Sequence, residues 1–149
     1  SHGGREAARE LVLDTGDPGT SGIGRWMSAT AATAHHGGDS LYAEVGGGAD
    51  TYVFRAVLPV AGQYRVEVWN ACYTPRHTRV PHSIRHADGT ATVFVDQDCR
   101  SGITGRWQVL GTYRFSPAQR AVVGITDAGL RANGTSYIGA DAVRFTRLD

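Results

Sequence analysis

Apolar and polar residues alternate with a period of two in several short segments of this chain. In the segment 63–73, Tyr64, Val66 and Val68 fall on one side. Trp69 falls on the other side, together with the charged residues. A period of two is typical of a β-strand with one buried and one wet face. The pattern therefore predicts a strand here and places Trp69 on its wet face.

Similar segments follow one another, separated by turn signals rich in Gly, Pro, Asp and Asn. The predicted strands cover 51–58, 63–73, 90–95, 105–115, 120–126 and 136–148, with less regular candidates at 10–15 and 40–46. Only 5–11, "REAAREL", has helical character, and it is too short to form a stable helix alone. The spacing predicts an all-β fold, an antiparallel β-sandwich of roughly eight strands with little or no helix.

The length of 149 residues suits a single domain with one core. We interpret residues 1–11 as a cloning remnant and linker, and residues 12–149 as one module. The net charge is +1 without a run of like charge, which removes the electrostatic source of nucleic-acid binding. No apolar stretch approaches the ~20 residues of a membrane span. Neither nucleic acid nor membrane insertion is therefore expected.

The two cysteines, Cys72 and Cys99, each lie at the end of a predicted strand. Cys99 falls in the polar stretch "VDQDCRSG", where a buried free thiol is unexpected. This favours a Cys72–Cys99 disulfide, which implies an oxidising compartment. The alternative is a pair of unrelated buried thiols.

Five segments, taken together and in order, resemble a known family. They are "LDTGDPGTSGIGRWMSATAATAHHGGDSLYAE", "YVFRAVLPVAGQYRVEVWNA", "IRHADGTATVFVDQ", "GRWQVLGTYRFS" and "GADAVRF". Their order and spacing over residues 12–146 are similar to those of the golvesin C-terminal-like family, which includes the carbohydrate-binding appendage of xanthan lyases. The chain departs from the family pattern around 72–82 and 98–104, where both cysteines fall.

The resemblance implies a β-sandwich of jelly-roll type and a noncatalytic role in polysaccharide recognition. It also implies a secreted bacterial module, tethered to a larger parent protein, that requires no cofactor. Such a module would be extracellular, periplasmic or at the cell surface. Trp26 and Trp107 accompany the strands that define the fold, so we assign both to the core.

Sugar binding needs flat aromatic faces beside planar hydrogen-bonding groups. Trp69 and Tyr73 share one side of the segment if the strand continues between them. The predicted ligand-binding residues are Trp69, Tyr73, Arg76, His77 and Arg79. Arginine forks would suit an acidic polysaccharide, but all fifteen basic residues are Arg, which weakens that inference. The alternative is that Trp69 packs against the other sheet.

The histidines suggest a metal site only at first sight. His77, His82 and His86 lie in a segment broken by prolines, which does not hold the geometry of a helical His-x₃-His site. His86 belongs to an H-x-D-G turn, which it is expected to stabilise. For calcium, the "DTGDPG" turn and the last strand offer a candidate oxygen set of Asp14, Asp17 and Asp141, with a metal-free turn as the alternative.

Catalytic signatures are weak. Ser83, His82 and Asp88 are near one another in sequence, but no G-x-S-x-G or H-E-x-x-H motif is present. We therefore expect a binding module and not an enzyme. The alternatives are a protein-interaction or adhesion domain and, as a weaker one, a small glycan hydrolase or lyase using a pair of strand carboxylates.

Overall fold

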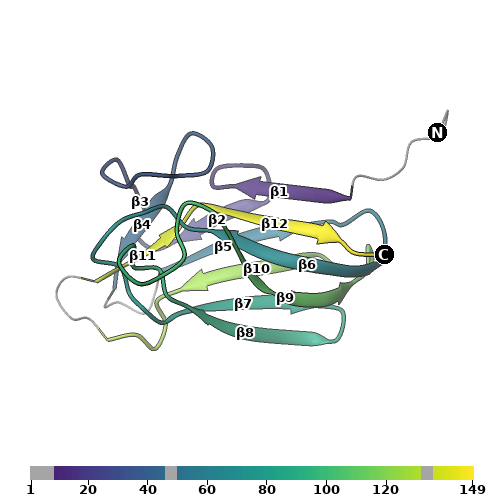
Figure 1. The fold of residues 1–149 in the computed structure, drawn as a ribbon. Coiled ribbons are helices and arrows are strands. Elements are labelled where there is room, and N and C mark those ends of the chain that lie inside the picture. Colours follow the sequence, from purple (N-terminus) through teal and green to yellow (C-terminus); the bar gives the residue numbers. More distant parts are fainter. Residues whose placement is uncertain (1–8, 46–49, 132–135) are drawn as a thin grey trace.

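The computed structural model describes residues 9–45, 50–131 and 136–149, which form twelve β-strands. Two twisted sheets face each other, and short strands with long loops gather at one end, on the left in Figure 1. The strands are β1 (Glu10–Asp14), β2 (Thr20–Ile23), β3 (Met27–Ser28), β4 (Leu41–Glu44), β5 (Thr51–Ala56), β6 (Gly62–Trp69), β7 (Val80–His86), β8 (Gly89–Val95), β9 (Trp107–Phe115), β10 (Ala121–Thr126), β11 (Tyr137–Ala140) and β12 (Ala142–Arg147).

One main sheet has the strand order β1-β12-β6-β9, and the other has the order β2-β5-β10-β7-β8. A third, small sheet has the order β11-β4-β3. Every pair of named strands is antiparallel. The predicted antiparallel β-sandwich is thus confirmed, with twelve strands where roughly eight were expected. We call the end that carries β3, β4 and β11 the loop end; it lies opposite the C-terminus (Figure 1).

The core lies between the two main sheets. Val66, Val68 and Phe145 project from one sheet, and Phe54 and Ile125 from the other; all five are fully buried. Burying these side chains is the main source of stability in this sandwich. The predicted inward face of the segment 63–73 is confirmed up to Trp69, where β6 ends.

Two of the predicted strands are not regular in the structure, which the alternation of apolar and polar residues did not reveal. The predicted strand 136–148 breaks at Asp141, and its halves, β11 and β12, join different sheets. In β9, a β-bulge opposite Val66 and Glu67 leaves Leu110 as the extra residue. Because a bulge reverses which side chains face inward, Trp107 and Val109 face outward before it, whereas Tyr113 and Phe115 face the core after it.

The bulge corrects the assignment of Trp107. It pairs with Trp69 across the sheet, and both lie on the outer face, half-buried. The assignment of Trp107 to the core was therefore wrong. Trp26 packs against the edge of the core, with its ring centroid 5.6 Å from that of Tyr52, as predicted.

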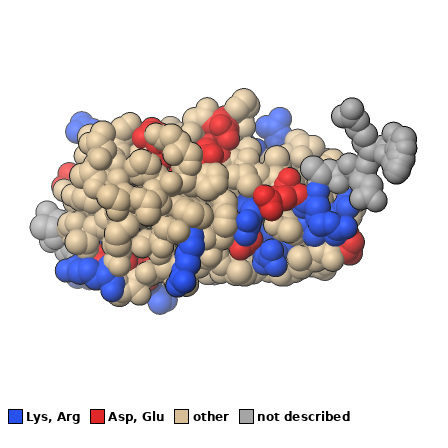
Figure 2. Space-filling model, turned by 45° about the horizontal axis from the view of Figure 1, so that its top comes forward, with Lys and Arg blue, Asp and Glu red and all other residues tan. Residues whose placement is uncertain are grey.

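Strand β1 begins at Glu10, two residues before the predicted start of the module. Residues 1–8, with most of the predicted linker, lie outside the described part. No helix in the described residues is long and apolar enough to cross a membrane. Figure 2 shows charges of both signs interspersed at one end of this face and scattered along its edges elsewhere, without a broad area of one sign.

Candidate functional site

A pocket opens at the loop end, with a volume of about 110 Å³. Its lining comes from β3 and the connection after it, from β4 and β11, and from the loop after β6. The lining residues are Ser28, Ala29, Thr30, Ala31, Ala32, Tyr42, Tyr73, Arg76 and Tyr137. A cavity needs roughly 10–15 Å³ to hold one water molecule. The volume of this pocket is several times larger and suits a group about as large as one sugar residue. Three tyrosines and one arginine supply its functional groups.

The small sheet positions two of the tyrosines. Tyr42 on β4 lies opposite Gly139 on β11, two residues from Tyr137. Antiparallel pairing therefore puts Tyr42 and Tyr137 on the same face. Their ring centroids are 5.4 Å apart in an edge-to-face arrangement. Tyr73 comes from the loop after β6 and packs against a separate cluster of small residues formed by Ala29, Ala32 and Ala71.

Arg76 is the charged group of the pocket, although only 3% of its surface is exposed. Its Cζ lies 5.5 Å from the centre of the Tyr73 ring. Burial lowers the pKa of Arg76 to about 10, so the guanidinium is still a cation at neutral pH. Its Nε and Nη2 atoms are buried and have no hydrogen-bond partner among the described residues. A buried cation without a paired anion is costly, which marks Arg76 as more than a packing residue.

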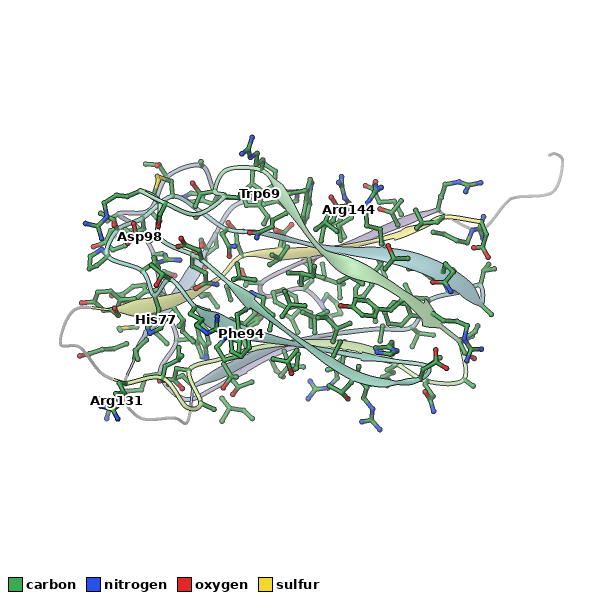
Figure 3. The ribbon with its side chains drawn as sticks, turned by 60° about the horizontal axis from the view of Figure 1, so that its bottom comes forward. Trp69, His77, Phe94, Asp98, Arg131 and Arg144 are labelled. Carbon is green, nitrogen blue, oxygen red and sulfur yellow. A yellow bond between two sulfur atoms is a disulfide. The ribbon has the colours of Figure 1, made fainter. Side chains whose placement is uncertain are left out.

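Asp98 holds the turn that carries Arg76. The Thr74 hydroxyl and the Arg76 amide donate to its Oδ2 at 2.6 and 3.0 Å, and Arg100 binds its Oδ1. The hydrogen bonds from Arg100 hold the pKa of the Asp98 carboxyl well below its usual range. Asp98 and His77 lie together at the loop end, with Arg144 further along the sandwich (Figure 3). The backbone of Arg76 is thus fixed by the buried Asp98 carboxylate, which forms no ion pair with the Arg76 side chain.

Gln97 fixes the part of β11 against which Arg76 packs. Its side-chain amide donates to the Gly139 carbonyl at 2.9 Å and accepts from the Gly139 amide at 2.8 Å. The Arg76 guanidinium lies directly against Gly139, where a Cβ atom would overlap its Nη1. The His77 amide donates to the Tyr137 carbonyl at 2.9 Å, which joins the arginine's segment to β11. These hydrogen bonds fix the backbone on which the Arg76 side chain rests.

The predicted disulfide between Cys72 and Cys99 is present, with the two Cα atoms 4.8 Å apart. The Cys99 amide also donates to the Tyr73 carbonyl at 3.1 Å, and Cys72 forms an isolated β-bridge with Thr33. The bridge thus pins the segment carrying Tyr73 against two other loops.

The structure divides the predicted ligand-binding residues between different places. Tyr73 and Arg76 line the pocket, but Trp69 does not, because β6 ends at Trp69 and the two aromatic residues no longer share a face. The Trp69 indole donates to the Ala34 carbonyl at 2.8 Å, and its ring contacts Trp107. Trp69 is on the outer face of its sheet, as the pattern predicted.

His77 and Arg79 also lie outside the pocket lining. The Arg79 amide donates to Nδ1 of His77 at 3.1 Å. The Arg79 guanidinium lies 4.1 Å from the centre of the exposed Phe94 ring. A ligand role for Trp69, His77 or Arg79 stays a prediction. Tyr42 and Tyr137, which were not among the predicted ligand-binding residues, line the pocket instead.

The candidate calcium ligands do not form a cation site. The described residues contain no group of three His, Cys, Asp or Glu side chains that could hold a metal ion. The Asp17 carboxylate accepts the Asp14 amide at 2.8 Å, and the Asp14 carboxylate contacts the His36 ring at 2.8 Å. Asp141 accepts the His36 amide at 3.0 Å, which is the backbone partner expected for a buried acid. Bound calcium stays a prediction that this geometry does not support.

The other histidines have structural surroundings. His82 is fully buried, with Nδ1 3.0 Å from the Val80 carbonyl. His86 accepts the Asp88 amide within its turn and stacks on Tyr113, which confirms its predicted role. The Asp88 carboxylate pairs with Arg114, so it is not the group that orients a histidine beside Ser83.

The family model of the golvesin C-terminal domain matches residues 11–147. The chain belongs to the golvesin C-terminal domain family. A xanthan lyase of Bacillus sp. (strain GL1) is 32% identical over 140 residues, which are 93% of this chain and 15% of that protein. The chain therefore corresponds to a small part of that relative.

Solved structures agree on the fold of this golvesin C-terminal domain. A Paenibacillus xanthan lyase matches with a TM-score of 0.81 and 30% identity, over 95% of this chain and 13% of that one. A family 35 carbohydrate-binding module from Clostridium thermocellum matches with a TM-score of 0.56 and 18% identity, over 91% of this chain and 98% of that one. At this identity, the second match shows a shared sandwich fold alone.

Proposed function

We propose that this golvesin C-terminal domain is a noncatalytic polysaccharide-binding module and that the pocket at the loop end is its sugar site. The observation that carries the proposal is the convergence of three tyrosine rings and one arginine on a pocket about as large as one sugar residue. Aromatic rings offer apolar faces to the C–H groups of a sugar, and polar side chains orient its hydroxyls.

The relatives support this proposal. A xanthan lyase is named for a polysaccharide, and this chain matches about one seventh of its length. A module of this size would hold a larger parent protein on its polymer, where even a weak site raises the local concentration of substrate. The disulfide fits secretion into an oxidising compartment.

The proposal predicts that Tyr73→Ala weakens binding to a polysaccharide by about tenfold or more, because it removes one stacking wall. Affinity electrophoresis in gels that contain xanthan or neutral glucans measures this effect directly. Phe94→Ala is the matched control, since it removes an exposed aromatic ring that does not line the pocket. Trp69→Ala tests the outer face in the same gels.

The outcomes separate the alternatives. Loss of binding with Tyr73→Ala alone supports the pocket, and loss with Trp69→Ala alone moves the sugar site to the outer face. No retardation of the folded wild-type domain by any acidic or neutral polysaccharide would overturn the proposed function.

A further inference from the structure

We infer that the pocket is selective for an acidic sugar, whose carboxylate binds side-on to the Arg76 guanidinium. This inference rests on the proposed function and names the class of ligand. It starts from the two unpaired nitrogens of Arg76, Nε and Nη2. These two atoms form one edge of the planar guanidinium, and their N–H groups match the two oxygens of a carboxylate.

Within residues 9–45, 50–131 and 136–149, no carboxylate supplies the missing anion. Asp98 and Asp141 lie close enough to act on the charge of Arg76. Asp98 forms its ion pair with Arg100 instead, and burial raises the pKa of Asp141 to about 7, which favours its neutral form. The oxygens of Asp98 are engaged by Thr74, Arg100 and the Arg76 amide. Asp141 accepts an amide with one oxygen, and its other oxygen has no partner.

Arg76 is the one charged side chain in the pocket lining, and it is buried there without an ion pair among the described residues. Arg76 lines a pocket wall, its backbone is held by Asp98, and its guanidinium rests on Gly139. The two unpaired nitrogens are shielded from solvent in this structure, so binding requires the guanidinium to turn slightly toward the ligand. Changes of side-chain rotamer are common when a ligand binds. A carboxylate entering the pocket would then pair with a cation that is already desolvated.

Carboxyl reduction gives the sharpest test, because it converts each carboxylate of a polymer into a hydroxymethyl group and leaves the sugar rings in place. We expect the wild-type domain to bind xanthan at least about tenfold more tightly than carboxyl-reduced xanthan. Methyl glucuronoside should compete with xanthan, and methyl glucoside should not. Failure of the glucuronoside to compete, with the preference for native xanthan retained, would assign the site to a different acidic substituent.

Arg76→Gln should abolish the preference for the unreduced polymer, whereas Arg76→Lys should keep part of it, since lysine retains the charge without the fork. Arg120→Gln is the matched control, because it removes an exposed arginine in the turn between β9 and β10 and changes the net charge equally. The melting temperature of each variant establishes that it is folded before binding is measured.

Gly139→Ala is a second variant, and it leaves Arg76 itself unsubstituted. The new methyl group would overlap the guanidinium, so the arginine must move away from the pocket wall. We expect a severalfold loss of affinity for unreduced xanthan and little change for the reduced polymer.

Two results would overturn different conclusions. Equal binding of both polymers, unchanged in Arg76→Gln, would refute the carboxylate site and leave the sugar-binding proposal intact. Binding of neither polymer by the folded wild-type domain would refute the proposed function and this inference together.

Discussion

Replacing Asp141 by Asn should make the domain increasingly unstable as the pH falls from about 6.5 to 4, relative to the wild type. Asp141 is 1% exposed, and burial raises its pKa from 3.8 to about 7. Between these values the folded protein keeps a proton that the unfolded chain has lost. The free energy of unfolding contributed by Asp141 therefore falls by about 1.4 kcal/mol for each pH unit of increase.

His82 acts in the opposite sense over nearly the same range. Burial lowers its pKa from 6.5 to about 4. Between these values the unfolded chain binds a proton that the folded protein excludes, so stability rises with pH. In the wild type, the contributions of Asp141 and His82 largely cancel between pH 4 and 6.5. Asp141→Asn removes one of them and exposes the other.

Urea unfolding at a series of pH values measures this effect. The free energy of unfolding of Asp141→Asn minus that of the wild type should rise by about 1.4 kcal/mol per pH unit between 4 and 7. His82→Leu should give the opposite slope between 4 and 6.5. The raised pKa of Asp127 is common to all the variants and does not enter the differences. A difference that does not vary with pH would show that Asp141 titrates normally in the folded protein.

The alternation of residues predicted the sandwich well, because burial on one face of a strand is a local property. It placed Trp69 on the outer face and Val66 and Val68 in the core. It failed for Trp107, since a bulge changes the phase without changing the composition of a strand. The alternation also predicted one continuous strand where the structure has β11 and β12. No local pattern shows that the chain passes from one sheet to another at Asp141.

The pocket was less predictable than the fold. Tyr73 and Arg76 were found because they are neighbours in a segment dense in aromatic and basic residues. Tyr42 and Tyr137 join them only through the pairing of β4 with β11, which a single sequence does not reveal. Gly139 carried a signal, since a glycine inside an apolar strand often marks a close approach by another group. The identity of that group, the Arg76 guanidinium, required the structure.

Removing the disulfide should lower the free energy of unfolding by about 3–4 kcal/mol, because the unfolded chain is released from a closed loop of nearly thirty residues. For a domain of this length, the expected fall in melting temperature is about 10 °C. The double variant Cys72→Ser/Cys99→Ser should show it by calorimetry, and the reductant dithiothreitol should lower the wild-type melting temperature toward the same value. Reductant should leave the melting temperature of the double variant unchanged, which controls for its other effects.

The same variant should remain folded at 20 °C but bind its polysaccharide more weakly. The hydrogen bonds of Cys72 with Thr33, and of the Cys99 amide with Tyr73, do not depend on the sulfur atoms and should hold the native arrangement. Without the covalent link, however, the segment from Cys72 to Arg76 pays more conformational entropy when a ligand orders it. Affinity that is unchanged despite a lower melting temperature would show that Asp98 and Gln97 suffice to fix the pocket, and that the disulfide serves stability alone.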